Sequence, residues 1–234
     1  MSEGVLVYSL AFLTLMPDYL CEDLDGVYHC DRLDTCPRVI GRLPLDQPNF
    51  SVNWENSTSL HNMVDVLDLR CAESWRIGLL GSSFFVGAVL GNLFISGLGD
   101  SMGRIAVMRI GLVITAATYF LFMFVSRSLI LDYILLTLFG SMQCWRENVA
   151  FLYSQEITAA KYQTIVGSGF NVFDSSTLIV VALYYWYVSK SYEWIHLFYF
   201  GLIGSSLVIV MLLPESPKFL VSMKRYSEAR KVFD

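Results

Sequence analysis

The stretch ISGLGDSMGRIAVMR, residues 95–109, lies between two long apolar segments and decides the class of fold. It places Asp100, Arg104 and Arg109 beside turn-forming glycines. A charged side chain is costly in the hydrocarbon of a bilayer, so a stretch this rich in charge does not continue a membrane span. Glycine lets the backbone turn tightly at such a point. The stretch therefore predicts a short polar hinge between two membrane helices.

The composition of the whole chain agrees with a membrane protein. Of its 234 residues, 55% are hydrophobic and 16% are charged, and the mean hydropathy is +0.52. A soluble domain with this balance would expose too much apolar surface. A membrane helix takes about 20 apolar residues. Five runs are of that order: 75–98, 105–125, 129–153, 165–188 and 195–213.

A sixth apolar run, residues 5–16, is shorter than a bilayer span. It could be a cleaved signal peptide, although no basic region precedes it. We interpret residues 1–20 instead as an incomplete first span. The chain is then an all-α integral membrane protein of six helices, with spans two to six in residues 75–213.

Charge is distributed unevenly along the chain. Residues 17–74 hold eleven acids and four bases, a net charge of −7, and the rest carries +2. Short basic segments mark the cytoplasmic side of a membrane protein. With alternating helices, this rule places the loop 21–74 outside, in the extracellular or lumenal space, and the segment 214–234 in the cytoplasm. The membrane itself is either the plasma membrane or an endomembrane.

The loop 21–74 also has the sequence features of a secreted segment. It holds four of the five cysteines, Cys21, Cys30, Cys36 and Cys71. An even set in an oxidising compartment predicts two disulfides, with three possible pairings. Asn49 and Asn56 each begin a glycosylation sequon. The loop is therefore expected to be cross-linked and glycosylated. The loop is either a solvated cap without a ligand role, which is the simpler interpretation, or an acidic outer mouth that concentrates cationic solutes.

Three segments carry a resemblance to a known family: Ser96–Arg104 in the hinge, Tyr153–Glu156 (YSQE) and Pro214–Leu220 (PESPKFL). In this order they resemble the signature motifs of the major facilitator superfamily. The YSQE and PESPKFL segments are similar to those of sugar porters and organic ion transporters. The long cysteine-bearing loop is more similar to the organic cation/anion transporter branch, since sugar porters usually have a short loop there.

The resemblance implies a cytoplasmic gating latch at the hinge. In this interpretation the acid meets the positive N-terminus of a neighbouring helix, and the arginine bridges to acids at nearby helix ends. The latch residues are Gly99, Asp100, Gly103, Arg104, Glu156 and Glu215. Departures from the family pattern predict a weaker latch: Ser96, Ser101, Ile105 and Gln163, and the absence of an arginine near Leu136.

Family members resemble two six-helix halves around a central cavity, each half built from two inverted three-helix repeats. The six spans here correspond to an N-terminal half, and residues 214–234 to the segment that links it to an absent C-terminal half. We expect a fragment or truncated product. The alternatives are a half that pairs with another half and a six-helix subunit of a larger assembly.

Polar residues inside the predicted spans are candidates for substrate or proton binding. Gln143, Arg146 and Glu147 are spaced i, i+3, i+4 and share one face of the fourth span. Asn171 and Asp174 lie on the fifth span. Arg146 and Asp174 are both roughly 15 Å deep at 1.5 Å of rise per residue. The hypothesis is a buried charge cluster that lines a cavity, and the alternative is a structural ion pair.

These observations predict a secondary active or facilitative transporter of small organic solutes, most simply organic ions, that works by alternating access. The competing interpretations are a sugar porter-like carrier and a non-transporting membrane subunit. No nucleophile motif, phosphate loop or metal-ligand spacing occurs in the sequence, so we expect neither an enzyme nor a cofactor or metal. The expected partners are the bilayer, a small and preferably cationic solute, and a second six-helix half; nucleic acid is not expected.

Overall fold

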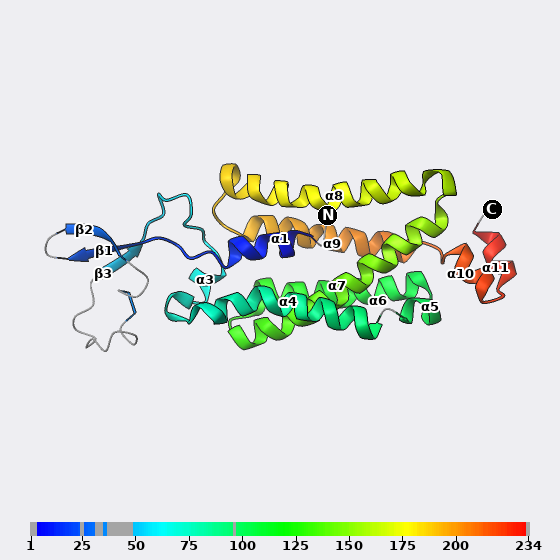
Figure 1. Ribbon diagram of the computed structural model, residues 1–234, viewed down its shortest axis with the longest axis horizontal. Helices are drawn as coiled ribbons and strands as arrows, with labels where there is room; N and C mark the ends of the chain where they lie inside the picture. Colours follow the sequence, from blue (N-terminus) through cyan, green and yellow to red (C-terminus); the bar gives the residue numbers. More distant parts are fainter. Residues whose placement is uncertain (1–3, 24–25, 31–34, 37–48, 96, 233–234) are drawn as a thin grey trace.

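The computed structural model describes residues 4–23, 26–30, 35–36, 49–95 and 97–232. Its helices form a bundle with roughly aligned axes (Figure 1). The main helices are α1 (Gly4–Leu13), α4 (Ser74–Ile95), α6 (Arg104–Phe120), α7 (Leu129–Ile157), α8 (Gln163–Leu183) and α9 (Glu193–Leu212). Short helical segments connect or follow them: α3 (Met63–Val66), η2 (Leu69–Cys71), α5 (Leu98–Met102), η3 (Leu121–Val125), η4 (Ala160–Tyr162), η5 (Tyr184–Val188), α10 (Pro217–Ser222) and α11 (Tyr226–Lys231).

Four of the described helical stretches are long and apolar enough to cross a membrane: Ser74–Phe94, Arg104–Val125, Ala160–Val188 and Glu193–Leu212. Their outer faces carry large apolar side chains such as Phe94, 78% exposed, and Leu212, 81% exposed. Water would be a poor solvent for such faces, which fits a multi-pass membrane protein. The 29-residue α7, which holds Arg146 and Glu147, lies in the same bundle and packs against α4 and α6.

The closest helix pairing is between α4 and α7, and glycines make it possible. A Cβ added at Gly87 would meet the backbone of Thr137, and one added at Gly91 would meet the backbone of Ser141. On the other helix, a Cβ at Gly140 would meet the carbonyl of Phe84. Small residues of this kind let helix backbones approach closely in a membrane, where dispersion contacts supply much of the association energy.

The expectation of a purely helical fold is incomplete, because three short strands lie beyond one end of the bundle (Figure 1). They are β1 (Tyr19–Asp23), β2 (Gly26–Cys30) and β3 (Asn49–Val52), antiparallel in the order β2-β1-β3. Consequently the first apolar helix does not run over residues 1–20: α1 ends at Leu13, and the strand that pairs with both others begins at Tyr19.

The four loop cysteines form two disulfides, as predicted, and the structure selects one of the three pairings. Cys21 of β1 is bonded to Cys30 of β2, with Cα atoms 5.6 Å apart. Cys36 is bonded to Cys71, with Cα atoms 5.5 Å apart. The second bond links the segment beyond the hairpin to the start of the α4 region, so it closes most of the loop.

Side chains also seat the loop against the bundle. Asn62 Nδ2 donates to the carbonyl oxygens of Phe12 (2.9 Å), in the last turn of α1, and of Leu15 (2.7 Å), just beyond its end. Lys190, between η5 and α9, donates through Nζ to the carbonyl of Asn56 at 2.9 Å. The loop is therefore held at two separate places on the bundle end.

Candidate functional site

The hinge lies at the bundle end opposite the strands, between α5 and α6 (Figure 1). Gly103 joins these helices with φ +100°, a conformation that side chains with a Cβ rarely adopt. A Cβ there would also lie 2.6 Å from Glu215 Oε2. Glycine is thus required at position 103 both for the turn and for the approach of a distant carboxylate.

Arg104, the first residue of α6, is 9% exposed and bridges three elements. Its Nη1 donates to the carbonyl of Gly99 (2.6 Å) and to Asp100 Oδ1 (2.7 Å). Its Nη2 lies 3.3 Å from Glu156 Oε1 near the end of α7. The Glu156 side chain is only 4% exposed, whereas that of Asp100 is 76% exposed. The pair with Glu156 is therefore the buried one.

The acid at the N-terminus of α6 is Glu215, which belongs to the segment after α9. Glu215 Oε1 accepts hydrogen bonds from the backbone N–H groups of Arg104 (2.9 Å) and Ile105 (3.2 Å). These are donors that a helix N-terminus leaves without intrahelical partners, and a negative charge there is favoured by the helix dipole. Asp100 instead forms an exposed i, i+4 pair with Arg104.

Ser216 completes what we name the hinge cluster: Asp100, Arg104, Glu156, Glu215 and Ser216. The Ser216 hydroxyl donates to Glu156 Oε2 at 2.5 Å, and Ser216 Oγ itself accepts a hydrogen bond from the N–H of Phe219 in the first turn of α10 at 3.5 Å. The six predicted latch residues thus meet at one place. Ser216 was quoted in the motif but given no role.

Three of the four residues that depart from the family pattern lie in the described part of the chain. Ser101 is exposed on α5, and its hydroxyl donates to the carbonyl of Leu98 at 3.2 Å. Gln163 Nε2 donates to the carbonyls of Gln155 (2.9 Å) and Thr158 (3.3 Å) at the C-terminal end of α7. The Glu156 carboxylate instead accepts from Arg104 and Ser216. Ile105 is buried and contributes its backbone N–H to Glu215. Ser96 lies outside the described residues.

A cavity of about 160 Å³ lies between α1, α4, α7 and α8. We name it the acidic cavity. Its lining residues are Gly4, Val7, Tyr8, Phe84, Gln143, Glu147 and Asp174. The Tyr8 hydroxyl donates to Asp174 Oδ2 at a long 3.4 Å. A Cβ at Gly4 would lie 3.2 Å from Asp174 Oδ1, so α1 approaches the carboxylate closely.

Three of the five predicted binding residues, Gln143, Glu147 and Asp174, therefore share one cavity. Arg146 is 2% exposed and does not line it; its side chain packs beside Gly111 of α6, whose added Cβ would lie 3.6 Å from Arg146 Cβ. Asn171 is exposed on α8, also away from the lining. Tyr8 also lines the cavity but was not predicted, because it lies inside an apolar run.

The two sequons differ in their surroundings. Asn49 is exposed on β3. Asn56 Nδ2 donates to Asp18 Oδ2 at 3.1 Å, and Asn53 Nδ2 donates to the same oxygen at 3.1 Å. The hydrogen bond from Asn56, then that from Asn53 and the nearby His29, lower the pKa of Asp18 below its ordinary value of 3.8, despite partial desolvation. Within the described part of the chain, no three His, Cys, Asp or Glu residues are placed to hold a metal ion.

Comparison with known proteins identifies the family. Residues 44–234 match the family described as sugar (and other) transporter. The chain is 28% identical over 194 residues to organic cation/carnitine transporter 2 of Homo sapiens, covering 80% of this chain and 34% of that protein. It is 26% identical over 215 residues to organic cation/carnitine transporter 3 of Arabidopsis thaliana, covering 88% and 41%.

A third relative, solute carrier family 22 member 2 of Oryctolagus cuniculus, is 25% identical over 215 residues, covering 88% of this chain and 38% of that protein. The chain thus spans about a third to two fifths of the length of these curated relatives. Since the family match extends over most of the sequence, the chain belongs to the sugar (and other) transporter family, within the major facilitator superfamily of membrane transporters.

Proposed function

We propose that this chain is the N-terminal half of an alternating-access carrier for small organic cations. The acidic cavity would bind the cation, and the hinge cluster would close the cytoplasmic side. The other half of the carrier would come from a C-terminal six-helix domain, since the relatives named above are more than twice as long as the region they share with this chain.

The observation that carries the proposal is the placement of two carboxylates in one cavity inside the bundle. Glu147 and Asp174 both line it. A cation bound between them would be attracted by both carboxylates, and this attraction is stronger away from bulk water. The rings of Tyr8 and Phe84 also line the cavity and can attract an ammonium group through their π faces. Two of the relatives are named organic cation/carnitine transporters.

The gating role rests on the connections that the hinge cluster makes. Arg104 joins the α5–α6 hinge to α7, and Glu215 and Ser216 tie the segment after α9 to both. Charge-assisted hydrogen bonds are strong but have well-defined geometry. A rigid-body tilt that separates these elements would release several of them together, which is what a two-state gate requires.

The proposed orientation of the chain in the membrane rests on the distribution of basic residues and on the position of the disulfides. The hinge end and the tail hold eight bases: Arg104, Arg109, Lys161, Lys218, Lys224, Arg225, Arg230 and Lys231. The opposite end holds the acidic loop with two disulfides. Both observations favour a cytoplasmic hinge and an extracellular or lumenal loop. Asn49 and Asn56 would then be accessible to N-glycosylation.

Uptake of radiolabelled tetraethylammonium into proteoliposomes tests the proposal. The chain would be reconstituted alone and together with the C-terminal half of its human relative. We expect uptake only with both halves, and its loss in Asp174→Asn. The control Glu228→Gln removes an acid of an exposed pair in α11 and should transport normally. Equal uptake by Asp174→Asn would contradict the proposed site. Failure of the wild-type pair to transport, with normal assembly, would favour a non-transporting subunit.

A further inference from the structure

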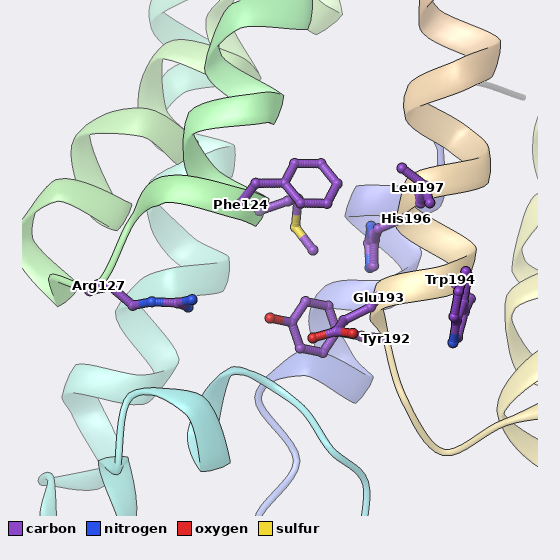
Figure 2. A pocket seen from close by; sticks show the side chains of 8 residues that line it. Phe124, Arg127, Tyr192, Glu193, Trp194, His196 and Leu197 are labelled. Carbon is purple, nitrogen blue, oxygen red and sulfur yellow. The ribbon is translucent and has the colours of Figure 1, made fainter.

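A second cavity, of about 300 Å³, opens at the loop end of the bundle between the end of η3 and the start of α9. Its lining includes Phe124, Arg127, Tyr192, Glu193 and His196, and the proposed transport cycle uses none of them. Figure 2 shows these side chains projecting from the two elements toward a common space. We name it the outer pocket.

The outer pocket carries one charge of each sign. Arg127 follows η3, and Glu193 is the first residue of α9. Both are exposed, and the Arg127 side chain is hydrogen-bonded to that of Tyr192. The Tyr192 hydroxyl lies on the Arg127 side of the space (Figure 2). A ligand with separated negative and positive groups would match this arrangement.

A buried polar atom belongs to the same pocket. His196 is 0% exposed, and its Nδ1 lies 2.6 Å from the Tyr119 hydroxyl. Its Nε2 has no hydrogen-bond partner among the described residues. Figure 2 shows the ring projecting from α9 between Phe124 and Tyr192. A buried polar atom without a partner is unfavourable, so a polar group entering the pocket would be stabilised there.

The exposed side chains on the helix faces beside the pocket indicate what kind of ligand would carry this polar group. Phe120 and Leu121 on one side are 44% and 41% exposed, and Leu197 and Phe198 on α9 are 50% and 63% exposed. Trp194, 67% exposed, lies at the rim and is typical of the membrane–water interface. The pocket is therefore a polar site at the end of apolar faces suited to acyl chains.

We propose that the outer pocket binds the headgroup of a zwitterionic aminophospholipid. The phosphate lies against Arg127, the ammonium against Glu193, and the acyl chains run along the apolar faces of α6 and α9. His196 Nε2 hydrogen-bonds to the headgroup. An anionic lipid without the amine would leave Glu193 facing a negative headgroup, so the pocket selects by charge.

Native mass spectrometry of the full 234-residue chain tests this assignment. The chain would be released from nanodiscs of equimolar phosphatidylethanolamine and phosphatidylglycerol. We expect phosphatidylethanolamine to be retained about fivefold over phosphatidylglycerol, the ratio given by one exposed ion pair. Glu193→Gln should bring the ratio to about one, and Arg127→Gln should lower retention of both lipids about fivefold. Glu73→Gln removes a matched exposed acid paired with Arg76 and should change nothing.

Equal retention of the two lipids by the wild type would overturn the proposal, as would an unchanged preference in Glu193→Gln. Soluble phosphoethanolamine serves as a second probe. If it displaced the lipid at comparable concentration, the acyl chains would contribute nothing and the lipid assignment would be wrong. Since Arg127 and Glu193 are exposed, neither substitution should prevent folding, and circular dichroism checks this.

Discussion

The hinge cluster and the acidic cavity both hold carboxylates, but the hydrogen bonds of Glu156 and Glu215 in the cluster differ from that of Asp174 in the cavity. In the hinge cluster, Glu215 accepts two backbone N–H groups of α6, and Glu156 accepts from Arg104 and Ser216 at 3.3 and 2.5 Å. In the cavity, the one hydrogen bond described for Asp174 comes from Tyr8 at 3.4 Å. Well-satisfied charges stabilise one arrangement of helices. A carboxylate that lines a cavity and is held by one long hydrogen bond, as described for Asp174, is available to a ligand.

Replacing Arg104 by alanine should have the largest effect, because it leaves Glu156 buried without its counter-charge. Removing one partner of a buried pair costs about 3 kcal/mol, and we expect a loss of that order in the free energy of unfolding, measured by SDS titration. Arg225→Ala, in an exposed pair with Glu228, is the control and should cost less than about 1 kcal/mol. Equal losses in the two variants would mean that the hinge cluster is no better buried than a surface pair.

A substitution that changes packing without changing charge gives a loss of stability to compare with that of Arg104→Ala. In Gly87→Ala the new Cβ would meet the Thr137 backbone, so α4 and α7 must separate. We expect a loss of about 2 kcal/mol, the usual cost of overpacking, in the same SDS titration. Gly81→Ala, on the same helix, meets no described atom within 4 Å and should be neutral or slightly stabilising. The contrast fails if both variants behave alike.

Within the hinge cluster, Asp100 should matter less than Glu156. Asp100→Asn breaks an exposed pair worth at most about 1 kcal/mol, so it should shift the ratio of closed to open hinge by no more than about fivefold. Glu156→Gln should shift it further, since Glu156 is buried against Arg104 and Ser216. Distances between spin labels on α5 and α10 would report both shifts. No shift in either variant would reduce the cluster to a structural contact.

The smallest expected effect concerns the loop and depends on pH. The Asn56 hydrogen bond keeps the folded-state pKa of Asp18 below 3.8. Its stabilisation is therefore fully present above pH 3.8 and is lost as the pH falls through that lower pKa. Hydrogen exchange in residues 49–58, corrected for intrinsic rates, should rise below pH 3.8 in the wild type. Asp18→Asn should lack this acid-dependent rise, and Glu55→Gln should retain it.

The long hydrophobic runs, and the charged segments between them, predicted much of the helix bundle. The four membrane-capable stretches and α7 fall within a few residues of the runs from 75 to 213. The strands were missed because β1 to β3 are only four or five residues long and depend on a disulfide and on the pairing of β1 with β3, far apart in sequence. The interpretation of residues 1–20 as an incomplete span also made the first helix too long, because α1 ends at Leu13.

The latch residues were predictable as a group but not in their individual contacts. The order of the motifs predicted that Arg104, Glu156 and Glu215 lie at the same side of the membrane. Which acid meets the N-terminus of α6, however, depends on the path of the segment after α9. For the cavity, helical spacing placed Gln143 and Glu147 on one face, whereas the rotation of α7 against α6 decides that Arg146 points elsewhere. The rotation of a helix about its axis depends on how several helices pack together. The spacing of residues along one helix does not determine it.

The most direct test of the central claim is the equilibrium affinity of the purified chain for tetraethylammonium, in the wild type, Asp174→Asn and Glu228→Gln. If the Asp174 carboxylate binds the cation in the acidic cavity, Asp174→Asn should weaken binding at least tenfold, or about 1.4 kcal/mol. Glu228→Gln should bind as the wild type does. An Asp174→Asn affinity equal to that of the wild type would contradict the account.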